Sequence, residues 1–96
     1  MADLILPVKA IYFDQIKAGV KSHEFRLMSE HWNTRIHERS YRHVVLTRGY
    51  PKAGGVEGET RLTRRWNGYD IRTIKHEHFG ADPVAVSAID VSEAAV

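Results

Sequence analysis

The chain has no cysteine among its 96 residues and no hydrophobic run long enough to cross a bilayer. The missing thiols exclude disulfides and thiolate metal ligands, and they give no reason to expect an oxidising compartment. The N-terminal residues also lack the basic and apolar segments of a secretory signal. We therefore expect a cytoplasmic protein with no membrane partner.

Hydrophobic residues make up 43% of the sequence, which is enough for one core. A chain of 96 residues suits one domain and is too short for two. We find no internal repeat, linker or low-complexity tract. The sequence therefore predicts a single domain over residues 1–96, in which 92–96 form a frayed tail.

Charge is unevenly distributed although the net charge is only +2. Residues 35–75 contain ten basic and four acidic side chains, a net charge of +6, which leaves −4 for the rest of the chain. Most of these basic residues are arginines, whose planar guanidinium suits phosphates and bases. A polyanion is a plausible partner, and solvated strand faces are the alternative.

The first half of the chain alternates strand and helix patterns. An apolar strand over residues 3–6 precedes a helix over 9–18, and a second strand covers 21–27. Ser29 can cap a helix over 30–37, and a buried central strand follows over 41–47.

The second half contains strand patterns without a helix. Glycines make residues 51–59 a loop, and strands over 61–66 and 69–74 flank Asn67-Gly68, which has the chemistry of a two-residue hairpin turn. A loop over 76–83 and a closing strand over 84–91 follow. This order of elements predicts a small α+β barrel with two short helices.

The run from Gly19 to Arg26 concentrates opposite charges where the first helix ends. Tyr12, Phe13, Ile16 and Val20 form an apolar stripe on that helix, and Gly19 suits its C-terminus.

In an extended backbone, His23, Phe25 and Leu27 share one face, and we expect that face to be the core side. Glu24 and Arg26 then lie on the other face, with Lys21 at the mouth of the strand. An ordinary surface ion pair is the alternative interpretation of these charges.

Aromatic and basic side chains alternate later in the chain. Such interleaving suits the stacking of unpaired bases and the attraction of a nucleic-acid backbone. The residues concerned are Arg48, Tyr50, Arg64, Arg65, Trp66 and Tyr69. Trp66 could instead pack in the core, as large aromatics in small domains commonly do.

The segment His76-Glu77-His78 carries two histidines but no third ligand at recognisable spacing. We therefore expect no metal. One histidine should pack inward with Phe79 and the other face water, and His23 should be a hydrogen-bonded inward histidine.

The pattern Gly-x-Lys-x-x-Glu-x-Arg over residues 19–26 resembles the signature of the ASCH domain family. Segments 4–9, 48–51, 65–69 and 76–80 are similar to stretches of small bacterial and phage members. The resemblance implies a PUA-like barrel that binds RNA or a nucleotide-like ligand. Lys21, Glu24 and Arg26 would line its cleft, and no cofactor is implied.

The resemblance also implies an enzymatic alternative. Some small ASCH proteins are amidohydrolases that act on acetylated cytidine with a lysine, a threonine three residues later and a downstream glutamate. Lys21 matches the lysine, but Glu24 replaces the threonine, and Glu77 is the nearest stand-in for the glutamate. Ribonuclease activity also occurs in the family, which would use His23, His76 or His78 as acid or base.

Binding of single-stranded RNA or a nucleotide-like ligand by a monomer is thus the expected function. A hydrolase with Lys21 and Glu24 as catalytic residues is the first alternative. A protein-interaction module, in which the charges are only surface, is the second.

Overall fold

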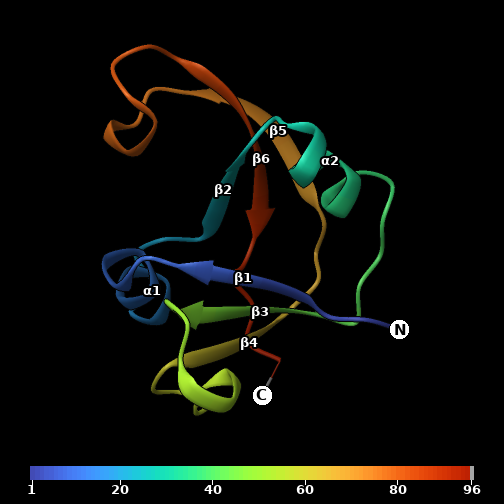
Figure 1. The fold of residues 1–96 in the computed structure, drawn as a ribbon, viewed down its shortest axis with the longest axis vertical. Helices are drawn as coiled ribbons and strands as arrows, with labels where there is room; N and C mark the ends of the chain where they lie inside the picture. The colour runs from blue at the N-terminus through green and yellow to red at the C-terminus, as the bar shows by residue number, and fades with distance from the viewer. Residues whose placement is uncertain (96) are drawn as a thin grey trace.

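The computed structural model describes residues 1–95, which fold into six strands and two α-helices (Figure 1). The strands are β1 (Leu4–Val8), β2 (His23–Leu27), β3 (His43–Arg48), β4 (Arg61–Arg65), β5 (Tyr69–Ile74) and β6 (Val84–Asp90). The helices are α1 (Ala10–Lys17) and α2 (Glu30–Ile36), and 3-10 turns cover η1 (Lys52–Gly54) and η2 (Glu77–Phe79). The α+β class is confirmed.

The strands form two sheets of three. In the first, β3 is central, parallel to β1 and antiparallel to β4. In the second, β6 is central and antiparallel to both β2 and β5. Figure 1 shows the two sheets crossing, with α1 beside the ends of β1 and β3. The prediction of a buried central strand is confirmed in β3, where Val44 to Thr47 are all buried.

The predicted hairpin between β4 and β5 is wrong, because these strands belong to different sheets. Gly68 does adopt the positive φ that a turn requires, at +80°. However, β4 pairs with β3 through buried Leu62 and Thr63, and β5 pairs with β6. Turn chemistry shows where the chain can change direction, whereas strand partners depend on distant contacts.

The residues after β6 connect the two sheets. Arg65 N donates to Glu93 O at 2.9 Å, and Ala95 N donates to Thr63 O at 3.1 Å. Residues 93–95 thus pair with β4 instead of fraying as expected, while Val96 lies outside the described residues. On the opposite side, the paired strands of residues 1–95 include no β1–β2 ladder, so a closed barrel is not confirmed.

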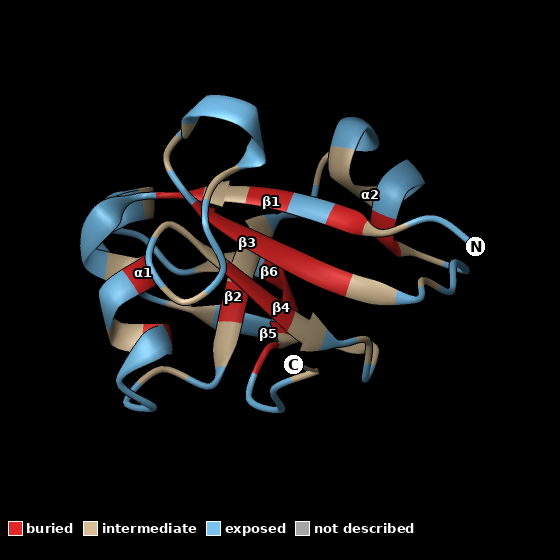
Figure 2. Cartoon of the chain, turned by 90° about the horizontal axis from the view of Figure 1, so that it is seen from below, coloured by how far each residue is buried: buried red, intermediate tan, exposed pale blue. Residues whose placement is uncertain are grey.

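The core lies where the two sheets and one face of each helix meet, as the buried positions in Figure 2 show. From α1, Phe13 and Ile16 enter it as predicted. Val20 does not, because the helix ends at Lys17 and Gly19, with φ +81°, turns the chain away, which leaves Val20 76% exposed. Within residues 1–95 the two helices are too short to cross a membrane.

The predicted N-cap of α2 is confirmed, since Ser29 Oγ accepts from Trp32 N at 3.2 Å. Replacing Ser29 with alanine should lower the free energy of unfolding by about 1 kcal/mol, because a helix N–H loses its partner. Urea denaturation measures this loss. Ser40→Ala, at an exposed loop position, is the control; an equal loss in both variants would contradict a capping role.

Candidate functional site

A cavity of about 430 Å³ lies between the end of β1 and strand β2. The first turn of α1, the start of α2 and the η2 turn complete its walls. Its lining comprises Pro7, Val8, Lys9, Tyr12, Lys21, Glu24, Phe25, Arg26, Leu27, Ser29, Trp32, His76, His78 and Phe79. The cavity therefore occupies the side on which no ladder joins the two sheets.

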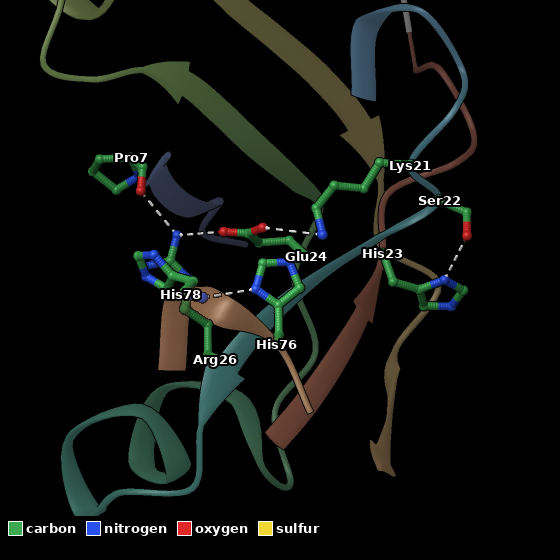
Figure 3. Close-up of polar contacts among 8 residues, drawn as sticks. All are labelled: Pro7, Lys21, Ser22, His23, Glu24, Arg26, His76 and His78. Carbon is green, nitrogen blue, oxygen red and sulfur yellow. Dashed lines mark hydrogen bonds and ion pairs between the residues drawn. The ribbon is translucent and has the colours of Figure 1, made fainter. Parts of the chain in front are cut away.

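A buried ion cluster forms one wall of this cavity (Figure 3). Arg26 Nη2 donates to Glu24 Oε2 at 3.1 Å and to the Pro7 carbonyl at 2.9 Å, so the guanidinium spans the gap from β2 to β1. Lys21 Nζ lies 4.0 Å from Glu24 Oε1. The three side chains that the sequence motif singled out are therefore brought together.

The strand alternation placed Glu24 and Arg26 on one face as predicted, but the assignment of the core side was wrong. Glu24 is only 7% exposed, whereas Leu27 of the expected core face is 42% exposed. An apolar/polar pattern assigns a glutamate to solvent. Here the two neighbouring cations balance the carboxylate, which allows it to be buried opposite Ile89 of the core.

Burial and charge act in opposite directions on this cluster. Burial raises the pKa of Glu24, and Arg26 and Lys21 oppose that rise. Burial also lowers the pKa of both Lys21 and Arg26, which Glu24 opposes. Each charged form therefore depends on its partners, a situation common in functional sites.

Aromatic rings hold the two cations. The Arg26 guanidinium carbon lies 4.6 Å from the centre of the Trp32 ring. Lys21 Nζ lies 4.2 Å from the centre of Phe25 and 5.5 Å from that of Tyr12. Cation–π contacts of this kind favour the charged forms and limit side-chain motion.

The η2 turn supplies a further wall, as Figure 3 shows for its histidines. The rings of His76 and His78 both pack edge-on against Tyr12, at 5.7 Å between centres. Both also contact Phe79, so the expectation that only one histidine packs with it is wrong, whereas the expectation that one faces water is confirmed, since His78 is exposed. Within residues 1–95, no group of three potential ligands could hold a metal.

Burial lowers the pKa of His78, and the neighbouring positive charges of Lys9 and Arg26 act in the same direction. The folded state thus favours the neutral imidazole relative to the unfolded chain, whose pKa is about 6.5. The contribution of His78 to the free energy of unfolding should be fully present above the unfolded-state pKa and be lost as the pH falls through the lower folded-state pKa. Urea denaturation between pH 7.5 and 5 should show a smaller pH-dependent loss for His78→Gln than for the parent. Equal losses would contradict this.

The other predicted site residues lie outside the cavity lining. Arg48 pairs with Asp14 at 3.3 Å, Arg65 pairs with Glu93 at 3.1 Å, and Tyr50 is 91% exposed. None of these three residues lines the cavity that contains the ion cluster, although Tyr50 is near enough to Arg26 to act on its charge.

Three further predicted residues have packing partners elsewhere. Arg64 Nη2 donates to the Ile16 carbonyl at 3.5 Å. Trp66 and Tyr69 pack against the core, as the alternative interpretation of Trp66 stated.

Some of the candidate acid–base residues line the cavity and others do not. His76 and His78 line the cavity, whereas Glu77 is exposed and lies outside its lining. His23 also lies outside it, half-buried and hydrogen-bonded to Ser22 and Arg72 instead of pointing into the core. The lysine and its neighbouring glutamate are therefore together without the downstream glutamate.

Sequence reasoning missed the aromatic walls formed by Tyr12, Phe25 and Trp32. The apolar pattern predicts Tyr12 on the helix stripe and Phe25 on the core face of its strand, and it assigns no functional role to Trp32. Tyr12 and Trp32 stand on the helices directly before and after the motif strand, which is the one signal that could have placed them near Lys21 and Arg26.

No family model, curated protein or solved structure matches the chain. The resemblance to ASCH domains therefore rests on the motif in residues 19–26 and its accompanying segments.

Proposed function

We propose that this chain binds RNA or a nucleotide-like ligand in the cavity between β1 and β2. The observation that carries the proposal is the cluster of Lys21, Glu24 and Arg26, brought together inside a cavity with aromatic walls. Both kinds of group that read a base edge, a donor cation and an acceptor carboxylate, are present there.

The dimensions of the cavity support a single nucleotide unit. Its volume of about 430 Å³ lies in the range typical of small-molecule sites. Trp32 and Phe79 also line the cavity beside the charged cluster, with the Arg26 guanidinium over the Trp32 ring. Stacking of an unpaired base on such rings is a common mode of single-strand recognition.

We also propose that the two sheets correspond to a PUA-like barrel of the ASCH type. The pairing of residues 93–95 with β4 supports this, because it joins the sheets on one side. The cavity then lies at the seam between β1 and β2. We further propose that this domain is monomeric and cytoplasmic.

Backbone NMR titration with a short single-stranded RNA tests the proposal. Shifts should concentrate in residues 19–26 and at the Trp32 indole, and they should weaken as salt increases. The Trp66 indole, which packs with Tyr41, is the internal control. Lys21→Ala should reduce the affinity by about ten-fold, since a charge-assisted contact is lost. Unchanged affinity would overturn the assignment of the site, and a protein-interaction module would then become the better interpretation.

A hydrolase is the second candidate, because Lys21 and Glu24 are adjacent in the cavity and burial shifts the pKa of both. A lysine with a lowered pKa loses its proton more readily, which a base or nucleophile requires. Incubation with acetylated cytidine tests for amidohydrolase activity, which would appear as a loss of absorbance of this substrate. RNA cleavage would instead implicate His76 or His78. Hydrolysis that persists in Lys21→Ala would contradict a catalytic role for this amine.

A further inference from the structure

The cavity carries an excess of positive charge. Lys9, Lys21 and Arg26 line it together with one carboxylate, that of Glu24. The formal charge of these side chains is therefore +2 while His76 and His78 are neutral. An uncharged ligand would leave this charge uncompensated, whereas a dianion would neutralise it.

Arg26 lines the cavity and, among the described residues, keeps a hydrogen-bond donor without a partner. Its Nη2 makes both contacts, to Pro7 and to Glu24, while its buried Nε has no partner among residues 1–95. An unpaired buried donor lowers stability. Because the Arg26 side chain lines the cavity and its guanidinium carries more N–H donors than the two contacts of Nη2 use, a ligand rich in acceptor atoms suits this wall.

Helix α1 adds to the positive electrostatic potential in the cavity. Its N-cap residue Lys9 makes no side-chain cap hydrogen bond, and both Lys9 and Tyr12 line the cavity. The positive end of the helix dipole therefore borders the space that contains the lysine and arginine groups. This helix end supplements the cations and does not define the site alone.

We propose that the cavity binds the terminal phosphomonoester of a nucleotide, either free or at the end of an RNA strand. The inference rests on the proposed nucleotide-binding function. A phosphomonoester carries a charge close to −2 at neutral pH and three strong acceptor oxygens, which match the surplus charge and the guanidinium group of Arg26. A phosphodiester within a chain carries one negative charge and would leave part of the surplus uncompensated.

Isothermal titration calorimetry of the full chain at low salt tests this with matched pairs. The ligands are the four ribonucleosides, their 5′-monophosphates, and a short single-stranded RNA that ends in either phosphate or hydroxyl. In at least one pair, the phosphorylated ligand should bind more tightly than the unphosphorylated one by a factor of about ten or more. The pair that shows the difference identifies the source as a free nucleotide or an RNA end.

Two other outcomes are distinguishable. If the unphosphorylated member of each pair binds as tightly as its partner, the phosphate inference is overturned and the proposed function stands. If no nucleoside, nucleotide or RNA binds, both are overturned.

Variants locate the phosphate. Lys9→Met and Lys21→Met keep the length of the side chain and remove its charge, so each should reduce the preference for the phosphorylated ligand by about three-fold or more. Lys17→Met removes a charge from the last turn of α1, outside the cavity lining, and should leave the preference unchanged. A preference retained in both cavity variants would overturn the assignment to this site.

Discussion

Replacing Glu24 with alanine is expected to lower the free energy of unfolding by about 3–5 kcal/mol. The reason is that two largely buried cations, Lys21 and Arg26, would lose the carboxylate that balances them. Their side chains are only 14% and 16% exposed, so water can compensate them little. Urea denaturation near pH 7 measures the loss.

A double-mutant cycle separates this charge effect from simple loss of packing. Arg26→Met removes the cation. The Glu24→Ala/Arg26→Met double variant should lose less stability than the sum of the two single losses, by about 0.5–3 kcal/mol. Glu59→Ala, at an exposed glutamate, should change stability by less than about 0.5 kcal/mol. Additive single losses would contradict coupling between Glu24 and Arg26.

The local elements were predictable because their causes are local. The end of α1 just before Gly19, the Ser29 cap and the apolar run of β3 each depend on a few adjacent residues. Their predicted boundaries agree with the structure to within about two residues, which is the usual uncertainty of a helix or strand end. The α+β class follows from their order.

Strand partners were not predictable, because they depend on contacts between residues far apart in the chain. Asn67-Gly68 has hairpin chemistry, yet β4 pairs with β3 and with residues 93–95, and β5 pairs with β6. In this pairing Leu62 of β4 lies opposite Leu46 of β3 and is buried in the core. No pattern within residues 61–74 carries that information.

The candidate site shows the same division. Lys21, Glu24 and Arg26 lie within six residues of one another, so one motif could identify all three. The walls come from α1, α2 and η2, and only the folded chain brings these elements to the motif strand. Conversely, Trp66 and Tyr69 are aromatic residues near arginines, as is typical of a surface that binds nucleic acid, but they pack against the core.

Replacing Phe13 with alanine should be the most damaging change in α1. The side chain is fully buried in the core, and truncation would leave a cavity, at a cost of about 3–5 kcal/mol in the free energy of unfolding. Urea denaturation measures the cost, and Phe13→Leu, which keeps most of the volume, should lose less. Ile11→Ala is the matched control on the same helix, since Ile11 is 60% exposed and alanine favours helix. An equal loss in both variants would contradict the observed burial of α1. Tyr12 of this helix and its N-cap residue Lys9 line the cavity, so the packing of Phe13 in the core should be required for ligand binding as well.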